Sequence, residues 1–112
     1  MIIPKDAIIA EEKIRDYLLI HRAKNDKSKL LARAGYTRDD FWELIRDIRA
    51  LLPSEAEFQE RKRYGTYYAV RGILHGPNGT SLAVKTIWIL DLESDIRFVT
   101  LVPDKEDNDN EI

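Results

Sequence analysis

Residues 66–102 read TYYAVRGILHGPNGTSLAVKTIWILDLESDIRFVTLV, and this stretch decides the fold. Its three runs of β-branched and aromatic residues predict strands over Thr66–His75, Ser81–Leu90 and Ile96–Val102. The first two runs are joined by Gly76-Pro77-Asn78-Gly79, and Asn-Gly between such runs favours a tight hairpin turn. The middle run is apolar on both faces around Trp88, which is typical of a central strand.

The composition indicates one domain. The chain has 112 residues, of which 44% are hydrophobic and 34% charged, and this is apolar material for a single core. We expect the domain to span residues 1–103. Residues 104–112 carry five acids and one apolar residue at the very end, so we expect a disordered acidic tail.

Cysteine and long apolar runs are missing from the sequence. The lack of cysteine excludes disulfides, thiolate zinc sites and cysteine nucleophiles. No run of about 18 apolar residues is present, and the first residues lack a signal-peptide pattern. We therefore expect a cytoplasmic location and no membrane partner.

Helical patterns come before the strands. Apolar residues recur at helical spacing in Ala10–Ile20, in Ser28–Ala34 and in a longer helix that ends at Pro53, with Ser28 and Thr37 as expected N-caps. Residues 55–63 are heavily charged and predict an edge strand with Phe58 as its main apolar anchor. This order predicts an α+β fold, with two to three N-terminal helices packed on one face of a four-stranded antiparallel β-sheet.

Alternation along the strands sorts their side chains between two faces. We assign the face of Trp88 and Phe98, with Thr86 and Thr100, to the core. The opposite face then gathers three cations, an aromatic and four aliphatic residues: Arg71, Lys85, Arg97, Tyr67, Ile87, Ile89, Val99 and Leu101. Cations and an aromatic on an open sheet suit phosphates and bases. Alternatively, the cations pair with strand acids such as Glu57 or Glu60.

The aliphatic residues of that face form a patch larger than soluble monomers usually expose. We therefore expect another polypeptide to cover Ile87, Ile89, Val99 and Leu101. It would be a second copy of the chain or an acidic partner protein that also neutralises the cations.

The two histidines give no metal site by spacing. His21 and His75 lack ligand spacing to each other or to acids, and no phosphate loop or dinucleotide fingerprint occurs, so we expect neither metal nor cofactor. His75 adjoins the hairpin turn and is interpreted as a solvated turn residue. His21 lies in the basic segment Lys13–Arg33, where an imidazole could act as general acid or base.

Short motifs follow one another in a fixed order along the chain. They are Ile14-Arg15-Asp16-Tyr17-Leu18-Leu19, Ser28-Lys29, Gly35-Tyr36, Tyr64-Gly65-Thr66-Tyr67-Tyr68, Gly76-Pro77-Asn78-Gly79, Val84-Lys85-Thr86-Ile87-Trp88-Ile89 and Arg97-Phe98-Val99-Thr100. Their order resembles a bacterial family of small domains of unknown function, whose members look like stand-alone genes beside a small partner or C-terminal toxin modules. The layout of helices before a four-stranded sheet is similar to the barnase–EndoU–colicin–RelE group of metal-independent ribonucleases.

This resemblance implies a toxin-type metal-independent ribonuclease domain that cleaves RNA phosphodiester bonds under the control of a cognate antitoxin. The family's basic residues and threonine fall on the catalytic candidates Lys29, Lys85, Arg97 and Thr100. The family histidine is lost, replaced by His21 two positions earlier, or not needed. Candidate RNA contacts are Lys24, Lys27, Arg71 and Tyr67.

A second hypothesis comes from a different class of protein. The chain would be a non-catalytic protein-interaction module that uses the same open sheet face. The two hypotheses differ in whether Lys29, Lys85 and Arg97 converge on one cleft.

Overall fold

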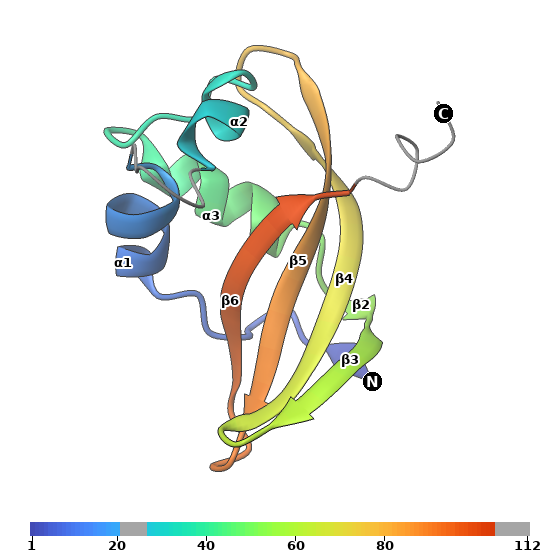
Figure 1. Ribbon diagram of the computed structural model, residues 1–112. Coiled ribbons are helices and arrows are strands. Elements are labelled where there is room, and N and C mark those ends of the chain that lie inside the picture. Colours follow the sequence, from blue (N-terminus) through green and yellow to red (C-terminus); the bar gives the residue numbers. More distant parts are fainter. Residues whose placement is uncertain (21–26, 105–112) are drawn as a thin grey trace, which may run out of the picture.

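The computed structural model describes residues 1–20 and 27–104, and a four-stranded antiparallel sheet organises them (Figure 1). Its strands lie side by side in sequence order: β3 (Glu57–Lys62), β4 (Gly65–His75), β5 (Ser81–Asp91) and β6 (Ile96–Pro103). A smaller sheet pairs β1 (Ile2–Ile3) with β2 (Ser54–Glu55). The predicted α+β class, the antiparallel order and the edge position of the charged strand are confirmed.

The hairpin of β4 and β5 is the centre of the sheet. Its register runs without a break from Gly65 opposite Asp91 to His75 opposite Ser81. Gly79 has a φ of 87°, which a non-glycine side chain rarely adopts, and it lets the chain reverse between the two strands. The Asn-Gly hairpin that the sequence predicts is confirmed.

The helical segments are short. They are α1 (Glu11–Lys13), a π-helical turn η1 (Ile14–Leu18), α2 (Ser28–Ala32) and α3 (Phe41–Arg49). The predicted caps are wrong, because Lys27 precedes α2 and Asp40 precedes α3, and neither helix has a side-chain cap. The Thr37 hydroxyl instead accepts a hydrogen bond from the Asp40 amide at 3.3 Å, in the turn before α3.

The core joins the helices to one face of the sheet. In Figure 1 the helices lie together on one side of the strands, and their buried residues share one cluster with the sheet. Leu44 and Ile48 of α3 belong to this cluster, as do Trp88 and Phe98, whose rings meet edge to face at 5.4 Å. The predicted core position of Trp88 and Phe98 is confirmed.

A hydroxyl is buried in this apolar core. Thr86 is fully buried; its Oγ1 accepts a hydrogen bond from the Trp88 indole and donates one to the Val70 carbonyl, each at 2.9 Å. Buried polar groups need such partners, because an unsatisfied one costs about 1–3 kcal/mol. The sequence prediction that Thr86 faces the core is confirmed.

A β-bulge in β6 reverses the alternation that the sequence predicts. Trp88 pairs with Phe98, but the next residue towards the hairpin, Ile87, pairs with Thr100, so Val99 is the extra residue. Beyond the bulge Leu101 faces the core and is fully buried, whereas Thr100 faces away from it. The predicted faces of Leu101 and Thr100 are therefore wrong.

Two further features bear on the edges of the sheet. Phe58 is 62% exposed, with its ring edge to face against Tyr68, so its predicted role as the main apolar anchor of the edge strand is wrong. At the other edge the Ile8 amide donates to the Ile96 carbonyl at 2.9 Å, and the Ile8 carbonyl accepts from the Phe98 amide at 2.8 Å.

Within residues 1–20 and 27–104 no helix is long and apolar enough to cross a membrane.

Candidate functional site

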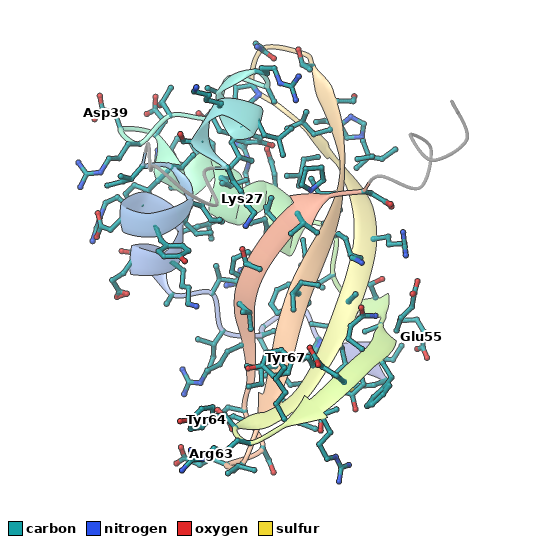
Figure 2. All side chains as sticks on the ribbon, in the orientation of Figure 1. Lys27, Asp39, Glu55, Arg63, Tyr64 and Tyr67 are labelled. Atoms are coloured by element: carbon teal, nitrogen blue, oxygen red, sulfur yellow. The ribbon has the colours of Figure 1, made fainter. Side chains whose placement is uncertain are left out.

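The sheet face opposite the core carries the candidate site, and we call it the open face. Strand register arranges its side chains in three rows across β4, β5 and β6: Tyr67, Ile89 and Arg97; Ala69, Ile87 and Thr100; Arg71, Lys85 and Val102. Figure 2 shows Tyr67 among the side chains of this sheet. Directly opposite residues lie about 5 Å apart and diagonal ones about 7–8 Å apart, so the polar members of the rows are close neighbours.

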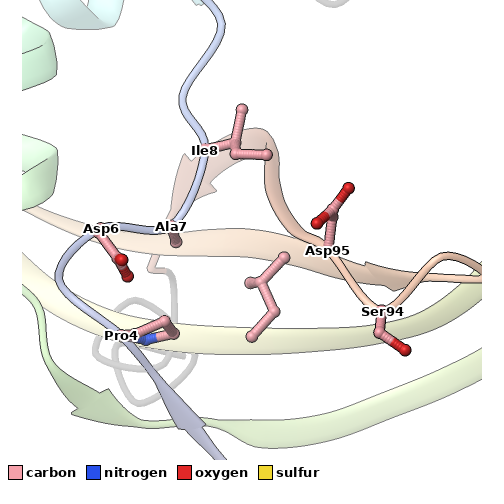
Figure 3. A pocket seen from close by; sticks show the side chains of 7 residues that line it. Pro4, Asp6, Ala7, Ile8, Ser94 and Asp95 are labelled. Atoms are coloured by element: carbon pink, nitrogen blue, oxygen red, sulfur yellow. The ribbon is translucent and has the colours of Figure 1, made fainter.

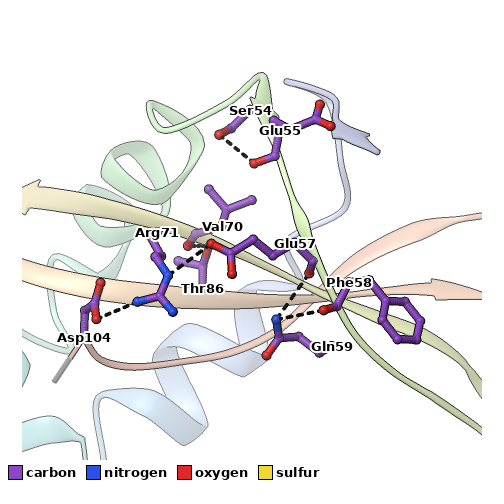
Figure 4. Close-up of polar contacts among 9 residues, drawn as sticks. All are labelled: Ser54, Glu55, Glu57, Phe58, Gln59, Val70, Arg71, Thr86 and Asp104. Atoms are coloured by element: carbon purple, nitrogen blue, oxygen red, sulfur yellow. Dashed lines mark hydrogen bonds and ion pairs between the residues drawn. The ribbon is translucent and has the colours of Figure 1, made fainter. Parts of the chain in front are cut away.

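The row of Arg71 and Lys85 is the most cationic. Figure 4 shows Arg71 held between two carboxylates: its Nε is 3.2 Å from Glu57 Oε1 and its Nη1 is 2.8 Å from Asp104 Oδ1. Lys85 lies opposite Arg71 and forms no ion pair with any described residue. The alternative of cross-strand ion pairs is therefore confirmed for Arg71 and Glu57, while Lys85 retains its charge for a ligand.

Arg97 at the other end of the open face is also paired. Its Nε lies 3.0 Å from Asp91 Oδ2 and its Nη2 lies 3.5 Å from Asp95 Oδ2. The Asp95 amide, followed by the Arg97 guanidinium and the Glu93 amide, holds the pKa of Asp91 below its usual value. This network closes the turn between β5 and β6, so Arg97 is a fixed cation.

Tyr67 and Thr100 complete the polar groups of the open face. The ammonium of Lys62 stands 5.7 Å from the centroid of the Tyr67 ring. The Thr100 hydroxyl makes only a long 3.4 Å contact to the Leu101 carbonyl, and its position is diagonal to Lys85. Simple alternation would place Thr100 on the core side of the sheet. The bulge instead places this predicted site residue on the open face, near Lys85.

The remaining predicted residues do not join this face. Lys29 is exposed on α2 and Lys27 is half-buried just before it, and α2 packs into the core through Leu31. His21 and Lys24 lie outside the described residues. The open face therefore brings together five of the predicted residues: Tyr67, Arg71, Lys85, Arg97 and Thr100. Lys29 lies on α2, on the opposite side of the sheet.

Sequence reasoning missed several polar partners. Asp104, assigned to the tail, extends the ladder through its amide to the Ala83 carbonyl at 2.9 Å, and its carboxylate contacts Arg71. His75 is not only a turn residue, because its Nδ1 lies 3.2 Å from Ser81 Oγ across the hairpin. That contact was readable from the sequence, since the Asn-Gly turn sets the hairpin register.

Tyr36 and Asp47 form a second polar pair away from the open face. The buried Tyr36 hydroxyl donates to Asp47 Oδ2 at 2.6 Å. Burial and then the neighbouring carboxylate raise the pKa of Tyr36 above its usual value. The pair ties the turn after α2 to α3, which is a structural role.

A pocket of about 210 Å³ lies between the first residues and the turn after β5 (Figure 3). Its charged groups are the carboxylates of Asp6 and Asp95, and no cation from the described part of the chain lines it, so it does not suit a phosphate. In residues 1–20 and 27–104, no three His, Asp or Glu side chains gather as a metal site would require.

Fold and site together define a class: a small α+β domain whose helices leave one cation-bearing face of an antiparallel sheet open. The chain belongs to the family described as Domain of unknown function (DUF6883), which matches residues 4–105. Among curated proteins, none matches the chain.

A solved structure shares this fold. It is a chain of the contact-dependent growth inhibition toxin–immunity protein complex from Klebsiella pneumoniae 342, with a TM-score of 0.67 and 16% sequence identity. The match covers 88% of the present chain and 94% of that chain. At this identity the likeness establishes a common fold.

Proposed function

We propose that this chain is a toxin-type ribonuclease domain that cleaves RNA with its own side chains, without a catalytic metal, and that a cognate partner protein controls it. The observation that carries the proposal is the open face, where Arg71, Lys85 and Arg97 lie on one sheet surface with Thr100. The fold shared with a chain of a toxin–immunity protein complex supports the toxin role and the partner.

Lys85 and Arg71 would bind the scissile phosphate. Their side chains leave directly opposite positions, and Lys85 has no ion-pair partner among the described residues. Two cations placed there stabilise the negative charge that develops on phosphorus when the 2′-hydroxyl attacks. The Thr100 hydroxyl, diagonal to Lys85, would add a hydrogen bond, and Arg97 would bind a neighbouring phosphate.

Proton transfer needs a base for the 2′-hydroxyl and an acid for the leaving oxygen. On the open face the candidates are the Tyr67 phenol and the Glu57 carboxylate beside Arg71. The resemblance adds His21, which is outside the described residues. Lys24, Lys27 and Lys29 would contact the RNA beyond this face.

The second candidate function is a non-catalytic interaction module. It is favoured by Lys29, which lies on α2 across the sheet and does not converge with Lys85 and Arg97. It is also favoured by the ion pairs of Arg71 and Arg97, which already neutralise two of the three cations of the open face, and by the half-buried Ile87 and Ile89 between them. Such a module would bind a protein over the same face and would leave RNA intact.

The test is cleavage of a fluorescent RNA oligonucleotide by the purified chain in excess EDTA. We expect cleavage by the wild type and a loss of about 10²–10³-fold in Lys85→Ala, as for removal of one group that stabilises developing charge. Arg63→Ala removes another exposed cation, in the turn between β3 and β4 and outside the three rows of the open face, and should keep full activity. A folded wild type that leaves RNA intact would favour the interaction module.

A further inference from the structure

Trp42 is exposed on the outer side of α3, beside a group of cations. The sequence pattern placed it at the edge of the core-facing side of the helix, but 53% of its surface is exposed. The guanidinium of Arg46, one turn further along α3, stands 5.4 Å from the centroid of the Trp42 ring. A large flat ring stacked with an arginine is therefore presented to solvent.

Next to this pair lies a recess of about 290 Å³, lined by Lys5, Arg46, Arg49 and Ala50. Among the described residues, no carboxylate lines the recess. The Arg49 Nη1 donates to the carbonyls of Lys5 and Ala7 at 2.8 and 2.9 Å, and this holds Lys5 beside the two arginines. The structure thus builds a three-cation site from two segments that are far apart in the sequence.

Two acids act on Arg46, Asp47 and Glu43, and neither of them lines the recess. Asp47 Oδ1 accepts from the Nε of Arg46 at 3.1 Å, but a guanidinium has five N–H donors, so others remain for a ligand. Asp6 lines the separate pocket of Figure 3. The charge of the recess therefore suits an anion.

Single-stranded RNA satisfies both parts of this surface, because a base stacks on an aromatic ring while cations track the phosphates. A duplex keeps its base faces covered, and an acidic peptide would engage the cations without needing the ring. We infer that Trp42, Lys5, Arg46 and Arg49 form a binding site for single-stranded RNA. The site is separate from the open face, and it extends the proposed function by holding the substrate at a second point.

Tryptophan fluorescence gives a direct readout of this site. The protein has two tryptophans, and Trp88 is fully buried, so a stacking base quenches Trp42. The ligand is 2′-O-methyl oligouridine, which lacks the attacking hydroxyl and stays intact. We expect quenching at low salt. Trp42→Leu lacks the reporting fluorophore, so its affinity is measured from the anisotropy of the same oligonucleotide carrying a fluorescein label, and it should be about 5- to 150-fold weaker. Lys5→Ala should lower the slope of log affinity against log salt by about 0.7.

Tyr64→Leu is the matched control. Tyr64 is 65% exposed and has the guanidinium of Arg63 5.7 Å from its ring centroid, so it repeats the arginine–aromatic pair at another place. We expect its affinity and quenching to equal those of the wild type. Unchanged binding by Trp42→Leu, or equal quenching by polyglutamate, would overturn the site, and the latter would identify a surface for acidic protein.

Cleavage measured in parallel separates this site from the proposed activity. Quenching without cleavage would overturn the ribonuclease and leave the binding site in place. Cleavage without quenching would overturn the binding site alone. Lys85→Ala should lower cleavage by the same factor of about 10²–10³ and leave the quenching of Trp42 unchanged.

Discussion

At the scale of single residues, Thr86 explains how a polar side chain fits the centre of the core. Its hydroxyl links the Trp88 indole to the Val70 carbonyl, so three polar groups are satisfied together. Replacing one member leaves the others buried without partners, which costs more than the hydrogen bond itself contributes. The hydroxyl thereby fixes the orientation of the largest fully buried side chain.

We expect Thr86→Val to destabilise the domain by about 1–3 kcal/mol, because the indole N–H and the Val70 carbonyl lose their partner. Urea unfolding monitored by circular dichroism measures the change. Thr100→Val makes the same substitution on the open face, where the hydroxyl has only a 3.4 Å contact, and should change stability by less than about 0.5 kcal/mol. Equal losses in the two variants would contradict the buried network.

At the scale of elements, the strands were predictable because alternation and turn residues are local. The sequence alone placed β4, β5 and β6 to within one residue. The bulge at Val99 was not predictable, because the residues of β6 read like those of a regular strand. The extra residue is recognised only from the pairing, in which Trp88 lies opposite Phe98 but Ile87 lies opposite Thr100. One inserted residue then exchanged the faces of Thr100 and Leu101.

Part of the candidate site was also predictable from the sequence. Strand alternation correctly placed three cations on the open face, because each lies before the bulge or on a strand without one: Arg71, Lys85 and Arg97. The ion pair of Arg71 with Asp104 was missed, since a composition rule assigned Asp104 to the tail. Exposure of Trp42 depends on how the helix sits on the sheet, which helical periodicity does not define.

The bulge itself can be tested with two alanine substitutions. Simple alternation puts Val99 and Leu101 on the same face, whereas the structure buries Leu101 fully and leaves Val99 half-exposed at the bulge. We expect Leu101→Ala to cost about 2–5 kcal/mol of stability and Val99→Ala less than about 1.5 kcal/mol. Chemical denaturation gives both values. Similar costs would mean that β6 has no bulge at this position.

At the scale of the whole molecule, the open face joins charge and apolar surface. Leu101 leaves the predicted patch for the core, so Ile87 and Ile89 are its centre, with Val99 at the bulge and Arg71, Lys85 and Arg97 around them. Nothing in the described part of the chain packs over these residues as a core. We propose that a cognate partner or a second copy covers them, because burying each large aliphatic side chain contributes about 1.5–3 kcal/mol.

Sedimentation of the isolated chain tests this cover. We expect concentration-dependent self-association when no partner is present, and a monomer for the double variant Ile87→Lys with Ile89→Lys. Because both side chains are only half-buried, the melting temperature should stay within a few degrees of the wild type. The control Ile73→Lys changes an exposed isoleucine of β4, beyond the three rows, and should still self-associate. A wild type that is monomeric at all concentrations would contradict self-association.

The bridge between Ile8 and the last strand also has a consequence for synthesis. The hydrogen bonds of Ile8 with Ile96 and Phe98 join the beginning of the chain to its final strand, and β6 supplies Arg97 and Thr100 to the open face. Contacts of such long sequence separation form late, after loop-closure entropy has been overcome. During translation the first residues therefore cannot pair with β6 until that strand has left the ribosome. A nascent chain would therefore lack its complete open face until almost the whole domain has been made.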